Sequence, residues 1–423
     1  MTTQRAPGAS ADDAASAAAG KASGEASGSP WPGAAGFAPW RAELTPEVAQ
    51  ALRLSPLASL GAAALDAVDV VVVGAGIAGL SAAWAASAAG AHTLVLEAAE
   101  GIGHGATGRN AGILSAGINM GLADLPPDGP DAAMWPATTR ELLALAEEAA
   151  QPGALLAATL TGALSLAETA AAARRLAREA HARQALGLRA ELWAPAQVAA
   201  RTGGRLETRG VVEALWLPDE GRIQPLTLLA RTAEWARAAG ATLAGGARVA
   251  GWRARGGAGK ARRWAITLAD GRELSARGLI VATGPVPTAN ARIYALAYAV
   301  DLPADFPLFW DAAPYTYCDY RPGPGYLVSS GGRYGQAGGS PREAAYYRRL
   351  ERGARRWLPE LAQATPSHAW AVDLDVSADL APRLRELEAG AAGVVVEGLG
   401  ALGVLPGVIL GRRAGERIAR QTR

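Results

Sequence analysis

The residues whose spacing most clearly indicates chemistry form a glycine-rich turn, Gly74-Ala75-Gly76-Ile77-Ala78-Gly79. The turn follows a run of valines at residues 70–73, typical of a buried strand, and opens an Ala-rich helical segment that ends at Gly90. In such a turn the first glycine permits the tight bend, the second lets the backbone approach a pyrophosphate, and the third lets helix and strand pack closely. We therefore predict that a dinucleotide binds at Gly74, Gly76, Ile77, Ala78 and Gly79, where the helix N-terminus supplies amides and positive dipole.

An acidic residue, Glu97, closes the next predicted strand at residues 93–97 and completes a strand-helix-strand unit. We expect its carboxylate to accept hydrogen bonds from ribose hydroxyls. Together these features favour a nucleotide site over the simpler interpretation of a glycine-rich helix start. They do not decide between nicotinamide and flavin. Residues 103–114 supply small side chains and backbone donors for the middle of a cofactor, for which a nicotinamide enzyme has no obvious use.

One part of this stretch, Thr107-Gly108-Arg109-Asn110-Ala111-Gly112, carries a family resemblance. It is similar to the Ser-Gly-Arg-Asn-Gly-Gly run of the amine-oxidising members of the FAD-dependent D-amino-acid oxidase superfamily, which includes glycine oxidase, sarcosine oxidase and bacterial amine oxidases. The similarity extends over about residues 66 to 423. It implies FAD as the cofactor, bound beside residues 107–112. It also implies an α/β fold, in which a Rossmann-type parallel sheet binds FAD and an inserted mixed sheet forms the substrate domain.

Three further segments resemble the same family. Residues 221–225, followed by a helix, are similar to the turn before its second nucleotide-contacting stretch, in which a valine like Val249 meets the adenine through its backbone. Ala282-Thr283-Gly284 resembles a strand end that passes close to the cofactor, which assigns Thr283 and Gly284 to the site. Residues 394–403 resemble the closing strand and glycine loop beneath the flavin. This likeness assigns four more residues to the cofactor: Gly400, Leu402, Gly403 and Val404.

By pattern alone, residues 394–403 could also be a second dinucleotide fingerprint, but no strand with an acidic end follows before Arg423. In the resembling family the helix that starts here would stabilise negative charge developing at the flavin N1 and O2 edge. The chain departs from the family at Ala401-Leu402-Gly403, where Gly-His-Gly is common, and at Trp370-Ala371-Val372, where Trp-Gly-Gly is common.

A cluster of polar aromatic and basic residues lies where the family places an inward-facing strand: Tyr315, Tyr317, Tyr320, Arg321 and Tyr326. Arg321 could bind a carboxylate through two hydrogen bonds while a tyrosine hydroxyl bonds to the same group. We therefore expect Arg321, Tyr317 and Tyr320 at the catalytic site. The alternative is that Arg321 lies on the surface and the tyrosines pack within a sheet, and Arg333 is the rival carboxylate ligand.

Two further side chains have both a chemical and a simpler interpretation. Cys318-Asp319-Tyr320 has the Cys-x-Tyr form in which sarcosine oxidases attach flavin covalently, but a small buried hydrophobe is the commoner role of a free cysteine. We expect non-covalent FAD and keep Cys318 as a minority candidate for attachment. His104 is more simply a loop residue near phosphate than a base, because hydride transfer from a neutral amine needs no strong base.

Composition sets the outer limits of these predictions. The 423 residues are enough for two domains, half of them are apolar, and the formal charge is only +2. The sequence has no block of like charges to bind nucleic acid and no run of about 20 apolar residues to span a membrane. One cysteine and four scattered histidines predict no metal site. We expect a cytoplasmic protein.

The expected domains alternate along the chain. A disordered tail at residues 1–30 and an N-terminal arm at residues 31–67 precede them. The FAD-binding domain is expected at residues 68–130, 221–290 and 376–423. The inserted substrate domain is expected at residues 131–220, as a mostly helical part, and at residues 291–375.

The function expected from the resemblance is oxidation of a small-molecule amine or amino acid. The substrate carbon would pass hydride to flavin N5, the imine product would hydrolyse, and oxygen or another electron acceptor would reoxidise the cofactor. Two alternatives remain: a dehydrogenase of a hydroxyacid or polyol C–OH bond, and a non-catalytic FAD-binding protein.

Overall fold

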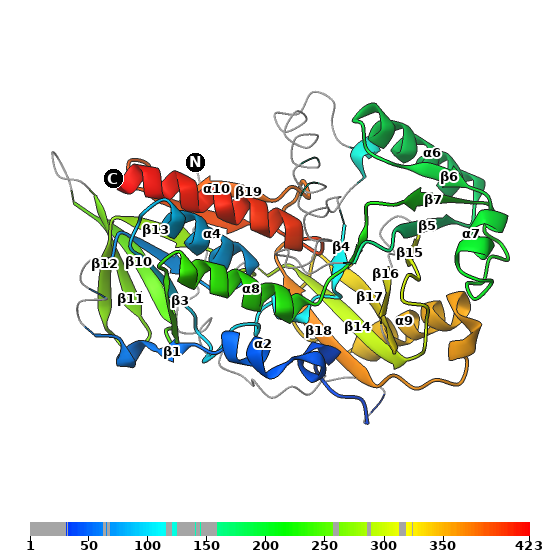
Figure 1. The fold of residues 1–423 in the computed structure, drawn as a ribbon, viewed down its shortest axis with the longest axis horizontal. Coiled ribbons are helices and arrows are strands. Elements are labelled where there is room, and N and C mark those ends of the chain that lie inside the picture. Colours follow the sequence, from blue (N-terminus) through cyan, green and yellow to red (C-terminus); the bar gives the residue numbers. More distant parts are fainter. Residues whose placement is uncertain are drawn as a thin grey trace, which may run out of the picture.

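The computed structural model describes residues 31, 33–61, 65, 68–115, 121–124, 140, 144, 159–256, 262–285, 289–312, 319–323 and 325–423. The predicted tail, residues 1–30, lies outside this set. Two β-sheets, each with helices packed against it, lie next to each other along the long axis of the molecule (Figure 1). The expected fold class, a Rossmann-type parallel sheet with an inserted mixed sheet, is confirmed.

The first sheet has seven strands, and its neighbouring strands are parallel except at one edge, where β19 and β20 are antiparallel. Its four-valine strand β2 pairs in register with β3 on one side and β13 on the other. Across the sheet the strands are β1 (Ser55–Pro56), β9 (Thr242–Gly245), β3 (Thr93–Leu96), β2 (Val70–Val73), β13 (Gly278–Val281), β20 (Gly393–Glu397) and β19 (Arg383–Glu386).

Successive side chains of a strand point to opposite faces of the first sheet, and this divides the core around the sheet into two layers. Val70 and Val72 pack with the helices on one face, whereas Val71 and Val73 pack with Trp264 and other residues of a small antiparallel sheet on the other face. The helices are α4 (Ile77–Ala88), α8 (Pro225–Ala238) and α10 (Val404–Thr422), and the small sheet is β10 (Val249–Arg255), β11 (Arg263–Leu268) and β12 (Glu273–Ala276). The parallel sheet is therefore covered on both sides.

The second sheet has eight strands, all antiparallel to their neighbours except the parallel pair β5 and β15. Its order is β18 (His368–Leu374), β14 (Ala291–Ala299), β17 (Tyr326–Tyr334), β16 (Asp319–Gly323), β15 (Leu308–Asp311), β5 (Ala163–Ala167), β7 (Glu213–Leu217) and β6 (Glu191–Trp193). Helices α6 (Ala170–Ala185), α7 (Pro195–Arg201) and α9 (Glu343–Trp357), with the turn η5 (Pro359–Leu361), accompany it.

The expectation that residues 131–220 are mostly helical is wrong for their described part. Residues 159–220 contribute strands β5, β6 and β7 as well as helices α6 and α7. Strand β5 reads Ala-Leu-Ser-Leu-Ala and is buried along its whole length. Its alanines have a high helix propensity, which tertiary pairing with β7 and β15 overrides.

The N-terminal arm contacts both sheets. Its strand β1 pairs with β9 at the edge of the parallel sheet, and Ala35 forms an isolated parallel bridge with His368 beside the mixed sheet. Between them lie η1 (Pro39–Glu43) and α2 (Pro46–Ala51), and η2 (Leu57–Ser59) follows β1. The remaining short elements are η3 (Thr107–Arg109), η4 (Leu122–Asp124) and the β4–β8 pair (Ile113–Leu114 with Gly221–Arg222).

Two negative findings apply to the described parts of the chain. None of the helices there is long and apolar enough to cross a membrane. Nor do three or more histidine, cysteine or acidic side chains gather there in a group that could hold a metal ion.

Candidate active site

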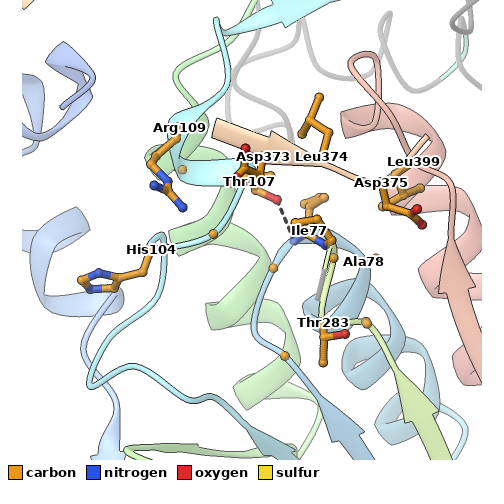
Figure 2. Close-up of a pocket in the computed structure, with 18 of the residues that line it drawn as sticks. Ile77, Ala78, His104, Thr107, Arg109, Thr283, Asp373, Leu374, Asp375 and Leu399 are labelled. Atoms are coloured by element: carbon orange, nitrogen blue, oxygen red, sulfur yellow. Dashed lines mark hydrogen bonds between the residues drawn. The ribbon is translucent and has the colours of Figure 1, made fainter. Parts of the chain in front are cut away.

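A cavity of about 760 Å³ opens at the carboxyl ends of the parallel strands, between the first sheet and β18. This volume is within the roughly 300–1,000 Å³ range of ligand and cofactor sites. Its lining includes predicted cofactor residues from five segments: Gly74, Gly76, Ile77, Ala78, Glu97, Thr107, Gly108, Arg109, Thr283, Gly284 and Gly400. Figure 2 shows the N-terminus of α4 facing the cavity, with Arg109 and His104 on one side and Asp375 and Leu399 on the other.

Two positions, one in the turn between β2 and α4 and one in the first turn of α4, tolerate only glycine. Gly74 has a φ of +102°, and a Cβ atom there would lie 2.5 Å from the carbonyl oxygen of Ala282. A Cβ atom at Gly79 would lie 1.9 Å from the carbonyl oxygen of Gly74. These close approaches hold the start of α4 against the ends of β2 and β13, so the first-turn amides are directed at the cavity.

Two side chains bind the backbone of this turn from outside it. Glu97 accepts hydrogen bonds from the amide nitrogens of Ala75 at 2.8 Å and Ala99 at 3.0 Å, one on each carboxylate oxygen. Thr107 Oγ1 accepts a hydrogen bond from the amide nitrogen of Ile77 at 3.3 Å (Figure 2). Each carboxylate oxygen can accept a second bond, so Glu97 is held in place and can still receive a ribose hydroxyl.

The loop of residues 107–112, which resembles the family motif, is stabilised by hydrogen bonds of its own asparagine. Asn110 Nδ2 donates to the carbonyl oxygen of Thr107, and Asn110 Oδ1 accepts from the amide nitrogen of Gly112, both at 2.7 Å. Two buried indoles also donate to this loop. Trp370 Nε1 donates to the carbonyl oxygen of Arg109 at 2.8 Å, and Trp40 Nε1 donates to that of Asn110 at 3.0 Å.

An inner chamber of about 110 Å³ adjoins the large cavity beneath β14, β17 and β18. The two share lining residues, among them Ile77, Arg109 and Gly400. Further predicted cofactor residues line only the chamber: Asn110, Ala111, Leu402, Gly403 and Val404. The mixed sheet contributes apolar or small polar neighbours, including Ala295, Ser330 and Trp370.

Two arginines and one carboxylate of the cavity lining interact electrostatically: Arg109, which borders both spaces, and Arg292 and Asp373, which border the large cavity. Arg292 forms ion pairs with Glu343 and Asp373, each at 3.0 Å. Burial lowers the pKa of Arg292, but these pairs outweigh it and hold the pKa above its usual value. Burial also lowers the pKa of Arg109, and the Asp373 carboxylate opposes that shift. The Arg109 guanidinium has no hydrogen-bond or ion-pair partner among the residues described.

His104 borders the large cavity, as expected for a loop residue near phosphate. Burial lowers its pKa, and Arg41 adds to this effect, whereas Glu97 opposes it. These effects together favour the neutral imidazole near pH 7.

The placement of Arg321 contradicts its predicted role as a carboxylate ligand. The side chain is 3% exposed and donates to the carbonyl oxygens of Gly112 at 3.3 Å and Ile223 at 2.8 Å. Its third contact is the Tyr326 hydroxyl at 2.5 Å, and the guanidinium lies 4.8 Å from the Trp40 ring centre. Arg321 lines neither cavity and connects the mixed sheet to the residues beside the β4–β8 pair.

The other residues predicted for substrate contact have different outcomes. Tyr320 is wrong as a site residue, because it is fully buried in the mixed-sheet core and stacks on Phe309 with ring centres 4.6 Å apart. Tyr317 and Cys318 lie outside the described residues. Arg333, the rival ligand, donates to Gln336 and to the carbonyl oxygens of Ala337 and Gly338 in its own turn, and it lines neither cavity.

Three predicted cofactor residues line neither the large cavity nor the chamber. Gly79 and Gly112 support the turns that border the cavity, and Val249 starts β10. Conversely, sequence reasoning missed Gly36 and Asp373 in the large cavity and Trp370 in the chamber. The departure from the family pattern at residues 370–372 was the one signal that pointed to Trp370.

The cavity fits FAD, because a glycine cradle at a helix N-terminus, a fixed carboxylate and the small-residue loop of residues 103–108 line one continuous space. The fold and the site therefore define a flavoprotein class. A family model described as FAD dependent oxidoreductase (DAO) matches residues 69–417, and the chain belongs to this family of enzymes.

Solved structures show the same fold. Glycine oxidase from Geobacillus kaustophilus is 19% identical, with a TM-score of 0.69 over 83% of this chain and 94% of that chain. Iminodiacetate oxidase from Chelativorans sp. BNC1 is 21% identical, with a TM-score of 0.64 over 81% and 93%. L-Proline dehydrogenase from P. horikoshii is 16% identical, with a TM-score of 0.63 over 82% and 93%. No curated protein sequence is significantly similar to the chain.

Proposed function

We propose that this FAD-dependent oxidoreductase oxidises the C–N bond of a small amine or amino acid. The names of the three similar structures support the choice, because glycine, iminodiacetate and L-proline all carry an amine nitrogen. The observation in this chain that carries the proposal is the lining of the inner chamber.

The described lining of that chamber contains neither histidine nor carboxylate. Oxidation of a C–OH bond needs a group that removes the hydroxyl proton, whereas a neutral amine can release hydride by using its own nitrogen lone pair. A chamber of apolar and neutral polar groups with Arg109 at its boundary therefore suits an amine better than an alcohol.

The residues that would hold the cofactor follow from the geometry. The first-turn amides of α4 would bind the pyrophosphate, Glu97 the ribose, and the N-terminus of α10 at Gly403 and Val404 would face negative charge on the flavin ring. Bound FAD supplies a two-electron acceptor. We retain non-covalent binding as part of the proposal.

The side chains of the chamber would orient the substrate and exclude water. Val372 and Leu374 are apolar and cover one side, and the Trp370 indole contributes a broad surface beside Ser330. Arg109, desolvated and without a partner in the described chain, would bind a substrate carboxylate and so favour amino acids over plain amines. In the overall reaction the substrate loses two electrons and two hydrogens to become an imine, which water converts to a carbonyl compound and ammonia or an amine.

The test is anaerobic mixing of FAD-loaded protein with panels of amines, amino acids, hydroxyacids and polyols, followed by the visible absorbance of oxidised flavin. Bleaching by amines or amino acids is expected, and admission of air then shows whether oxygen accepts the electrons. Bleaching by hydroxyacids or polyols alone would replace the proposal with C–OH oxidation. Stable colour with every panel would indicate a non-catalytic FAD-binding protein.

Covalent attachment needs a separate measurement. After acid precipitation we expect the yellow colour in the supernatant. Colour retained in the pellet and lost in a Cys318→Ala variant would instead assign Cys318 as the point of attachment.

A further inference from the structure

The N-terminal arm precedes the family match, which begins at residue 69, yet it forms part of the wall of the cofactor cavity. Gly36 borders the cavity directly. The amide of Ala35 donates to the carbonyl oxygen of Ser367 at 3.0 Å, and the amide of Ala369 donates to that of Ala35 at 2.9 Å. The arm thus adds backbone pairing beside β18, where the mixed sheet meets the cavity.

Trp40 connects the arm to the cofactor loop. The residue is completely buried, and its indole Nε1 donates to the carbonyl oxygen of Asn110 at 3.0 Å. Its own carbonyl oxygen accepts a hydrogen bond from Gln224 Nε2 at 2.8 Å. The ring lies against the guanidinium of Arg321 and the ring of Tyr326, with centre distances of 4.8 Å and 5.9 Å.

The later part of the arm binds the start of the same loop. The carbonyl oxygen of Leu52 accepts a hydrogen bond from the amide of Ile102 at 2.9 Å. Arg237 of α8 donates to the carbonyl oxygens of Ala51 and Arg53, both at 2.8 Å. The arm therefore forms hydrogen bonds to both ends of the loop of residues 101–110.

We infer that Trp40 is a positioning residue of the FAD site, and that docking of the arm and binding of FAD stabilise each other. The indole fixes the Asn110 carbonyl, and with it the loop whose Thr107 side chain and backbone border the cofactor cavity. Coupling of this kind is reciprocal: an arm that raises FAD affinity must itself be held more tightly when FAD is bound. The inference rests on the FAD site and not on the choice of substrate.

The chain offers a closely matched control for Trp40→Phe. Trp264 is also buried, and its Nε1 donates to the carbonyl oxygen of Ala392 at 2.9 Å, on the face of the parallel sheet that does not border either cavity. Trp40→Phe and Trp264→Phe each remove one indole-to-carbonyl hydrogen bond. A merely structural role predicts similar effects of the two substitutions on stability and on FAD affinity.

The first measurement is a titration of the apoproteins with FAD, in which flavin fluorescence reports binding. We expect Trp40→Phe to raise the Kd for FAD roughly 5- to 20-fold and Trp264→Phe to leave it within about twofold of the wild type. Equal Kd values for the two variants would overturn the inference. Because this readout is binding, it is independent of whether the proposed amine chemistry is correct.

The second measurement is limited trypsin digestion with and without FAD, since Arg41 and Arg53 of the arm are exposed. FAD should slow cleavage at these two sites several-fold in the wild type and less in Trp40→Phe. Cleavage that FAD does not affect in the wild type would contradict the coupling.

A second variant keeps the test usable if Trp40→Phe does not fold. Gln224 Oε1 caps α8 by accepting from the amides of Leu226 and Thr227, while its Nε2 donates to Trp40. Gln224→Glu keeps the capping oxygen and replaces the donor to the arm with a carboxylate oxygen, which repels the Trp40 carbonyl. We expect a weaker FAD affinity and faster cleavage of the arm, and wild-type values for both would count against the inference.

Discussion

The large cavity and the inner chamber differ in how the chain builds them. The cavity is lined mainly by four short consecutive runs, residues 74–78, 103–109, 282–285 and 396–400. The chamber is lined by single side chains from β14, β17 and β18 together with two loops. Under the proposed function, binding of the dinucleotide part of FAD would depend on backbone geometry, whereas substrate selection would depend on side chains that separate strands bring together.

The largest expected effect tests the backbone of the cavity. A Cβ atom at Gly79 would lie 1.9 Å from the Gly74 carbonyl oxygen, so Gly79→Ala must open the turn. We expect FAD affinity to fall at least roughly 100-fold, or about 2.8 kcal/mol, in a fluorescence titration. The control is Gly251→Ala in β10, where no atom lies within 4 Å of the added Cβ. Wild-type affinity in Gly79→Ala would refute the predicted role of this turn.

The next effect separates two arginines near the cofactor loop. Arg321→Met should lower the free energy of unfolding by about 2–3 kcal/mol, because it leaves the buried Ile223 carbonyl without a donor and removes a cation from the Trp40 ring. Denaturant unfolding measures this. The KM of Arg321→Met for an amino acid should stay unchanged. Arg109→Met should instead raise the KM for an amino acid roughly 10-fold and that for a plain amine little, because one charge-assisted contact is lost.

A raised KM for Arg321→Met, together with unchanged stability, would support Arg321 as a substrate ligand. Such a result cannot arise from a guanidinium bonded to backbone carbonyls. Loss of FAD affinity in Arg109→Met would assign that arginine to the cofactor and not to the substrate.

A third test asks whether the chamber is separate from the cofactor cavity. Ala295→Met would fill the chamber from β14, and Ala297→Met adds the same volume two residues along the strand without bordering it. Both should cost about 1–3 kcal/mol of overpacking. Only Ala295→Met should lower kcat/KM, roughly 10- to 100-fold, with FAD affinity little changed. If FAD affinity falls equally, the chamber belongs to the cofactor.

The smallest effect concerns the mouth of the cavity. Burial and Arg41 lower the pKa of His104 below its usual value, so the ring is neutral in the free protein near pH 7. The negative charge of bound FAD would favour the protonated ring and raise this pKa. Binding then takes up a proton, and affinity must increase as pH falls. We expect FAD affinity to rise about 2- to 3-fold between about pH 7 and 5.5, and His104→Gln to remove that rise. An unchanged pH slope in the variant would show that His104 does not sense the cofactor.

The parts of the site that could be predicted are those with local causes. Gly74 and Glu97 are recognisable because a tight turn and a strand-end carboxylate follow from positions close together in sequence. The helical expectation for residues 131–220 failed because alanine favours helix in isolation, while the strand β5 is stabilised by partners more than 40 residues away in the chain.

The amino-acid sequence by itself was enough to predict the class of fold, from the family-like motifs, and the glycine turn between β2 and α4, because strand, turn and helix lie within a few residues of one another. Only the tertiary structure decided which arginine faces the chamber. Pairing of β4 with β8 brings Gly112 and Ile223 together, and hydrogen bonds to their carbonyl oxygens hold Arg321 away from the cavity and the chamber. It also decided that Trp40 and Trp370, 330 residues apart in the chain, bind adjacent carbonyls of one loop. Such contacts depend on burial and geometry that no local pattern encodes.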